Sequence, residues 1–220
     1  MLPKPGDIVC AGLDMGLRSD SSALVIVHRR KDILHVGEIV ELRPTPDTPL
    51  KPSEVVRTFA KAMKLHGCSY AVGDNHYRES VVEYLDEFDM TFCPGPSAPA
   101  VAYVRSRALM REGRVRLPRN ERLIQQLKEV QGRQTSGGGM SITHPRTANG
   151  GHGDIVSALV LALWQVSGDV VAEVKPEQGT REWVQQQVDR RKAKMREEQE
   201  RPKWQPARIH DRGVGASWRR

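Results

Sequence analysis

The order of its apolar segments constrains the fold of this chain more than any other feature. Three strand-like runs follow one another at residues 7–15, 22–30 and 33–42, the last two joined by a three-residue turn. Two further short apolar strands, at 69–73 and 90–93, alternate with segments of helical periodicity. Short connections first and helical crossovers later imply a mixed sheet with helices on both faces. We therefore predict an α/β fold with a mixed five-stranded sheet.

Apolar periodicity and caps place the helices between and after these strands. They are expected at about residues 53–67, 77–88, 98–112, 120–130 and 153–166, with Ser53 as the cap of the first and Gly67 as its stop. A short strand is expected at 115–117. Residues 131–151 contain six glycines and few apolar residues, which indicates an extra β-hairpin or a flexible loop.

Composition divides the chain in two. Residues 1–174 are long enough for one domain with a sizeable core. Residues 175–220 carry 13 Lys/Arg against 7 Asp/Glu and little apolar content, which is typical of a basic tail, helical at first and then disordered. The chain has no run near the roughly 18 apolar residues of a membrane span, and its start lacks the pattern of a signal peptide. Three cysteines without a CxxC pair indicate reduced core thiols rather than disulfides or zinc.

Positive charge is concentrated in a second place besides the tail. The net charge is +7, and residues 105–133 hold nine Lys/Arg against three Asp/Glu. Guanidinium groups suit contacts with phosphate, so Arg105, Arg107, Arg111 and Arg114 are candidate DNA-binding residues. Arg107 and Arg111 are four apart and share a helix face. The alternative is a solvated surface with salt bridges to acidic neighbours.

Three aspartates occupy positions where carboxylates can converge. Asp14 ends the first strand, Asp74 ends the fourth, and Asp154 opens the last apolar helix. If the first and fourth strands are neighbours, Asp14 and Asp74 meet at one sheet edge, and a helix packed across the sheet brings Asp154 there. Such carboxylates repel one another unless a cation is bound, and Mg²⁺ or Mn²⁺ prefers oxygen ligands. The alternative is that each aspartate is an ordinary cap or turn residue.

Two such ions can clamp a scissile phosphate, one activating water and the other stabilising the leaving 3′ oxygen. The three-aspartate placement therefore predicts a phosphodiester hydrolase that needs no side-chain nucleophile.

Three motifs resemble the nuclease domain of phage terminase large subunits. They are GLDMGLRSDSSALVIV, AVGDNHYRESVVEYL and GGHGDIVSALVLALW, in the order and approximate spacing of that family over residues 7–168. The resemblance implies an RNase H-like fold and an endonuclease that cuts concatemeric viral DNA by two-metal catalysis. It matches Asp14, Asp74 and Asp154 to the catalytic, metal-binding triad, and Asp20 to a further acidic position near the metals. For Asp20 a turn residue remains the alternative.

The family context also implies partners and a location. These are double-stranded DNA, a packaging ATPase domain, the portal protein and a small terminase subunit, in the host cytoplasm and without a membrane. His152, two residues before Asp154, is an auxiliary candidate that could contact phosphate or water, or be an incidental loop residue. The chain has no GxxxxGK[ST] loop, so an excised domain, a truncated product or a split subunit is expected and translocation is not assigned.

Three other functions stay open at this point. The first is a resolvase or RNase H-type nuclease outside packaging, because the substrate follows only from the resemblance. The second is an actin-like or sugar-kinase fold binding ATP at the DxG turn, although GGHGD is a poor second phosphate motif. The third is a packaging adaptor that binds DNA or the portal without cutting, which the loss of a metal aspartate would have favoured.

Overall fold

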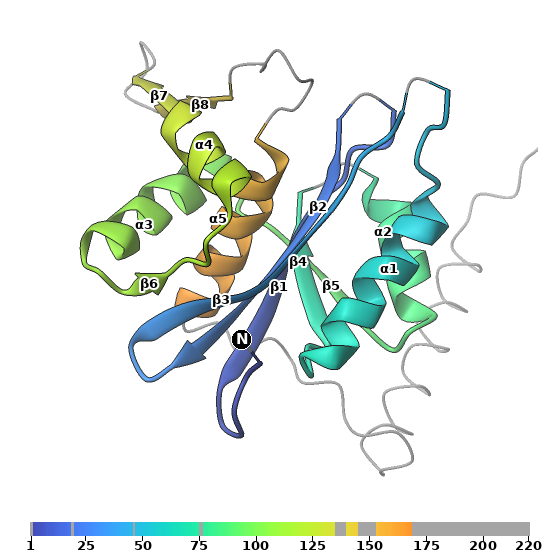
Figure 1. Ribbon diagram of the computed structural model, residues 1–220, viewed down its shortest axis with the longest axis horizontal. Coiled ribbons are helices and arrows are strands. Elements are labelled where there is room, and N and C mark those ends of the chain that lie inside the picture. Colours follow the sequence, from blue (N-terminus) through green and yellow to red (C-terminus); the bar gives the residue numbers. More distant parts are fainter. Residues whose placement is uncertain are drawn as a thin grey trace, which may run out of the picture. The chain divides into compact units, whose positions relative to one another are not determined.

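A computed structural model describes residues 2–18, 20–45, 47–74, 77–134, 140–144 and 153–168. The predicted basic tail at 175–220 and the auxiliary candidate His152 lie outside these residues. Within them, a central sheet runs between two groups of helices (Figure 1).

The sheet is mixed, with strand order β5-β4-β1-β2-β3-β6. Its strands are β1 (Ile8–Asp14), β2 (Ser22–Arg30), β3 (Ile33–Leu42), β4 (Tyr70–Gly73), β5 (Thr91–Pro94) and β6 (Val115–Arg116). The β1–β2 and β2–β3 pairs are antiparallel, whereas β4, β5 and β6 each join a neighbour in parallel. The mixed sheet is therefore confirmed, but it has six strands where five were predicted.

The sixth strand, β6, is only two residues long. It pairs with the start of β3 through Leu34 and Val115, next to a hydrogen bond from the Leu34 amide to the Arg114 carbonyl. Two residues carry too little periodicity to show from sequence that they join the sheet.

Helices cover both faces of the sheet, as predicted. Helices α1 (Pro52–Leu65) and α2 (Arg78–Asp86) lie on one face, and α3 (Pro99–Arg111), α4 (Glu121–Glu129) and α5 (Asp154–Ser167) lie on the other (Figure 1). Alternate residues of β2 pack against the helices on the two faces of the sheet. Val25 and Val27 face α5, while Leu24 and Ile26 face α1. Because both faces of β2 are covered, its apolar run is nearly continuous.

The ends of α1 show how sequence signals and structure compare. The helix begins at Pro52, whose fixed φ suits the first turn, and Lys51 is the N-cap. The predicted Ser53 cap is wrong by two residues. The predicted stop at Gly67 is confirmed, since Gly67 has a φ of +61°.

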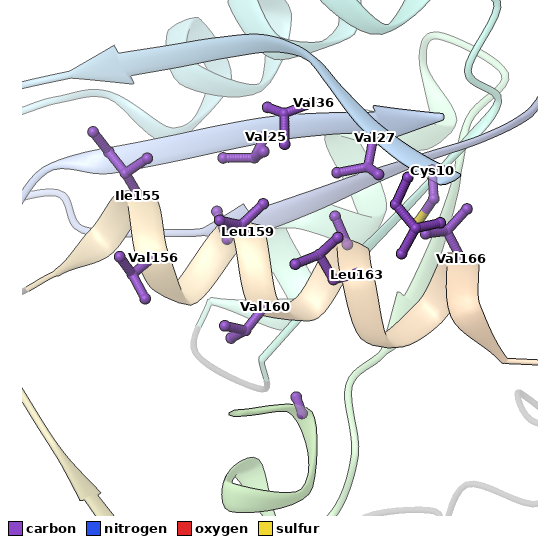
Figure 2. Close-up of a cluster of buried hydrophobic side chains, with 14 of the residues drawn as sticks. Cys10, Val25, Val27, Val36, Ile155, Val156, Leu159, Val160, Leu163 and Val166 are labelled. Carbon is purple, nitrogen blue, oxygen red and sulfur yellow. The ribbon is translucent and has the colours of Figure 1, made fainter. Parts of the chain in front are cut away.

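Helix α5 is apolar nearly all round because it lies between the sheet and α3. Ile155, Leu159, Leu163 and Val166 point toward the strands, while Val156 and Val160 point away from them (Figure 2). The helix crosses β1 at Gly12, where an added Cβ would lie 1.9 Å from the Ala158 carbonyl oxygen. Glycine at this position lets the two backbones touch, which fixes where the helix begins relative to the end of β1.

The predicted extra hairpin is present as a separate two-stranded sheet. Its strands are β7 (Gln131–Gln134) and β8 (Met140–Thr143), paired antiparallel with Gln131 opposite Thr143.

Candidate active site

Strand pairing and helix packing bring the three predicted aspartates to one edge of the sheet. Strands β1 and β4 run parallel, with Leu13 opposite Gly73, so Asp14 and Asp74 follow adjacent strands at the same edge. Asp154 is the first residue of α5, which packs on β1 and β2. The joint placement expected from the order of the elements is thus present.

The Asp14 carboxyl experiences the charge of the whole cluster. Burial, followed by the charges of Asp154 and Asp74, raises its pKa to about 8, with a smaller contribution from Asp20. A hydrogen bond from Ser157 acts in the opposite direction. Ser157 lies three residues after Asp154, on the same side of α5. A bound cation would relieve this repulsion.

Asp154 is almost fully buried and is held by residues that the sequence did not single out. The Ser21 hydroxyl donates to its carboxylate and lies 3.0 Å from Glu41 Oε1. Burial raises the pKa of Asp154, the Ser21 hydrogen bond lowers it, and the charges of Asp20 and Glu41 raise it further. Asp20 therefore contributes to the electrostatics of both Asp14 and Asp154.

Glu41 connects this part of the site to two arginines. Arg122 Nε lies 2.7 Å from Glu41 Oε1, and an Arg43 guanidinium nitrogen lies 2.9 Å from Glu41 Oε2. Burial raises the pKa of Glu41, but Arg43, Arg122 and Ser21 outweigh it and lower the pKa overall. One feature of the sequence could have pointed to Glu41, namely its place near the end of a predicted strand. In the sheet Glu41 pairs with Ala23, and Ala23 pairs with Asp14 at the end of β1.

A cavity of about 390 Å³ opens beside the carboxylates. Asp14, Asp74, Ser97, Tyr103 and Ser157 contribute polar groups to its wall, and glycine, prolines and aliphatic residues form the rest. Tyr103 also lines a second hollow of about 590 Å³ between α3, α4, α5 and the hairpin. Burial raises the pKa of Tyr103 to about 12, so its hydroxyl keeps its proton at neutral pH.

The donor set of the site suits a hard divalent cation. Its donors are carboxylate oxygens, and the charges of Asp154, Asp74 and Asp20 raise the pKa of Asp14, which is the arrangement a Mg²⁺ or Mn²⁺ ion stabilises. Within the described ranges, no three His, Cys, Asp or Glu side chains are already placed to hold a metal ion. The neighbouring aspartates thus lie close enough to raise the pKa of Asp14, but the described side chains do not form a closed coordination shell.

The four candidate arginines fall into two pairs. Arg107 and Arg111 line the larger hollow, as expected for residues four apart on one helix face. Arg105 donates to the Ser167 carbonyl at the far end of α5, and Arg114 donates to the Asp32 carbonyl in the β2–β3 turn. Since Asp154 begins α5 and Asp14 pairs with the start of β2, Arg105 and Arg114 lie toward the opposite end of the fold from the carboxylates.

Comparison with solved structures finds this architecture in large terminase nucleases. The large terminase nuclease from thermophilic phage G20c matches with a TM-score of 0.60 and 23% identity, over 74% of this chain and 84% of that one. The large terminase nuclease domain of Thermus phage P74-26 gives 0.60 and 22%, over 76% and 84%. The fold is that of a large terminase nuclease. The predicted RNase H-like fold and the resemblance that implied it are confirmed at this level.

Further comparisons show how far the similarity to known proteins extends. The HK97 bacteriophage large terminase matches with a TM-score of 0.61 and 18% identity, and the match covers 74% of this chain but 40% of that one. The G20c nuclease has also been solved with bound magnesium and with bound cobalt. No family model and no curated protein matches the sequence. Among the helices in the described part of the chain, none has the length and apolar character needed to cross a bilayer.

Proposed function

We propose that this chain is the nuclease domain of a viral packaging terminase, an endodeoxyribonuclease that cuts concatemeric viral DNA in the host cytoplasm. The observation that carries the proposal is the meeting of Asp14, Asp74 and Asp154 at one sheet edge, with the charges of the others raising the pKa of Asp14. The likeness of the fold to terminase nucleases, one of them solved with bound magnesium, supports it.

Asp14, Asp74 and Asp154 would hold the divalent ions, Mg²⁺ or Mn²⁺ and two in number, with Asp20 as a further acidic group. Bound ions of this kind supply an activated water and stabilise the charge that develops on the phosphate and the leaving oxygen. The chain's own part is to orient the carboxylates: Ser157 donates to Asp14, and Ser21 fixes Asp154. The cavity beside Asp14 and Asp74 would receive the scissile phosphate.

Double-stranded DNA is the proposed substrate, held by arginine contacts to its backbone. Arg107 and Arg111 are the favoured contacts, because they line the hollow that shares Tyr103 and Val160 with the cavity at the carboxylates. Such contacts position DNA without reading its sequence. A packaging ATPase domain, the portal protein and a small terminase subunit are proposed as the partners of the whole machine.

The deciding experiment is cleavage of supercoiled plasmid with Mn²⁺, Mg²⁺ or EDTA. We expect nicking and linearisation with either metal, none with EDTA, and a loss of at least about 100-fold in Asp74→Ala. Asp32→Ala is the matched control, since Asp32 is exposed in the β2–β3 turn, far from the site. Titration calorimetry with Mn²⁺ measures the number of ions bound.

The alternatives give different results in the same assay. Cleavage that survives Asp74→Ala would place the catalytic site elsewhere. Preferential cutting of branched or RNA-containing duplexes would favour a resolvase or RNase H-type enzyme. A protein that neither cuts nor binds Mn²⁺, yet binds DNA, would be the packaging adaptor.

A further inference from the structure

A continuous run of hydrogen bonds leads from the hairpin to the metal-site carboxylate Asp14. His144 Nε2, next to the end of β8, lies 2.7 Å from the Tyr103 hydroxyl of α3. The same hydroxyl lies 3.1 Å from Ser157 Oγ on α5. Ser157 and Asp14, at the end of β1, line the same cavity as Tyr103, and the Ser157 hydroxyl lowers the pKa of Asp14 as a hydrogen-bond donor does. Four different elements therefore meet through these four side chains.

The chemistry of the four groups gives this run one direction. A carboxylate that binds a cation is ionised and can only accept, so the Ser157 hydroxyl donates to Asp14. Ser157 Oγ has then used its proton and accepts from the Tyr103 hydroxyl. Tyr103 in its turn accepts from His144, which must carry a proton on Nε2. Each hydroxyl both accepts and donates, so removing one member takes one hydrogen-bond partner from its neighbour and weakens the orientation of the rest.

The imidazole of His144 packs closely against Gly153 at the beginning of α5. Gly153, the N-cap of α5, has a φ of +85°, and an added Cβ there would lie 2.2 Å from His144 Nδ1. The ring also contacts Tyr103, with centroids 5.4 Å apart at a tilt of 55°. The ring is therefore held between the beginning of α5 and Tyr103, with Nε2 toward the hydroxyl.

We propose that His144 is a positioning residue that orients Asp14 through Tyr103 and Ser157, and so ties the hairpin to the cleavage site. This role rests on the proposed nuclease function. Tyr103 suits the central place because it lines both the cavity beside the carboxylates and the hollow under the hairpin. Any shift of the hairpin end would change the orientation of Asp14 without a direct contact to it.

The first test compares Tyr103→Phe, His144→Leu and His144→Gln with the wild type. Gln places an amide donor near the position of Nε2, whereas Leu has none. We expect Tyr103→Phe and His144→Leu to lower both kcat for plasmid nicking and Mn²⁺ affinity by about 10–100-fold with little change in KM, and Gln to restore most of both. Tyr84→Phe, on α2 behind the other face of the sheet, is the matched control.

The double variant Tyr103→Phe with His144→Leu should be no worse than the poorer single variant, because both interrupt one chain. Additive losses in kcat, an unchanged Mn²⁺ affinity in Tyr103→Phe, or failure of His144→Gln to rescue would each overturn the proposal.

A second test needs neither nicking nor metal. Urea denaturation in EDTA of His144→Leu, Ser157→Ala and their double variant should show a coupling of about two-fold or more in the unfolding equilibrium constant. The coupling should vanish in the Tyr103→Phe background. If the wild type neither nicks nor binds Mn²⁺, the proposed nuclease function fails, and this cycle decides separately whether His144 acts on Ser157 through Tyr103. Additivity with Tyr103 present would overturn that linkage.

Discussion

At the scale of single residues, the carboxyl of Asp14 lies in a site where neighbouring carboxylates repel its negative charge. Asp14 is desolvated and surrounded by Asp154, Asp74 and Asp20, which raises its pKa to about 8. Asp154 is buried against Ser21 and shares the field of Asp20 and Glu41. A site built for cations is expected to cost stability when it is empty of them, since its charges are then uncompensated.

This repulsion predicts a pH-dependent gain of stability in Asp14→Asn. The pKa of the carboxyl is near its ordinary value of 3.8 in the unfolded chain and about 8 in the folded one. Between these values the folded state binds more protons, so the wild type loses stability as pH rises. In EDTA, Asp14→Asn should gain on the wild type by about 1–3 kcal/mol between pH 5 and pH 8. Urea denaturation at both pH values measures this.

The control for this prediction is Asp32→Asn, an exposed aspartate at the other end of the sheet. Its difference from the wild type should be nearly the same at the two pH values. A pH-independent difference for Asp14→Asn as well would contradict the assigned environment of Asp14.

At the scale of elements, the contact between β1 and α5 determines the geometry of the site. Gly12 allows the helix backbone to rest on the strand, and Ala158 and Ala162 are the facing residues. The helix then begins where Asp154 and Ser157 reach the end of β1. Small residues on both elements are therefore needed for the carboxylates to meet.

Substitution Gly12→Ala should displace α5 from β1. Its Cβ would lie 1.9 Å from a backbone oxygen, which side-chain adjustment cannot relieve. We expect a loss of about 1–3 kcal/mol or more, a Tm lower by about 2–4 °C for each kcal/mol, and weaker Mn²⁺ binding. Gly132→Ala in β7, where the nearest atom to the added Cβ would be the side-chain Met140 Sδ at 3.4 Å, is the matched control. Equal Tm values for the two variants would contradict this account.

Much of the fold follows from sequence at this scale, because buried strands and amphipathic helices leave a periodic trace. The short strand expected at 115–117 is present as β6, but two residues have too little periodicity to show that they join the sheet as its sixth strand. The convergence of Asp14, Asp74 and Asp154 could be expected from sequence, because carboxylates stand at the ends of two strands and at the start of a helix that packs on the sheet. The roles of Ser21, Glu41 and Tyr103 were not expected, because they depend on packing between distant segments and these residue types are common. Ser21 and Asp154, for example, are 133 positions apart.

At the scale of the whole molecule, the two pairs of candidate arginines lie in different places and so predict different paths for a bound polyanion. Arg107 and Arg111 line the hollow next to the site, while Arg105 and Arg114 hydrogen-bond carbonyls toward the other end. A DNA path across the carboxylates should therefore involve the first pair more than the second.

Salt dependence of DNA binding distinguishes the two pairs. Removing one arginine that binds a phosphate should reduce the slope of log K against log salt by about 0.9. We expect Arg107→Ala with Arg111→Ala to reduce the slope by up to about 1.8, and Arg105→Ala with Arg114→Ala to leave it nearly unchanged. Fluorescence anisotropy of a labelled duplex in EDTA, from low to physiological salt, measures both. The opposite ranking would place the DNA on the other end of the fold.

The separation of Ser21 and Asp154 along the chain also determines when the site can form during protein synthesis. Strands β1 to β3 leave the ribosome early, whereas α5 is the last of the described elements to be made. At about 5–20 residues per second, the 133 intervening positions take at least roughly 7 s to synthesise. Until α5 docks, Asp14 lacks both Asp154 and the Ser157 hydroxyl. A nascent chain of the proposed nuclease is therefore expected to be inactive, because its catalytic site forms only when α5 packs on the sheet.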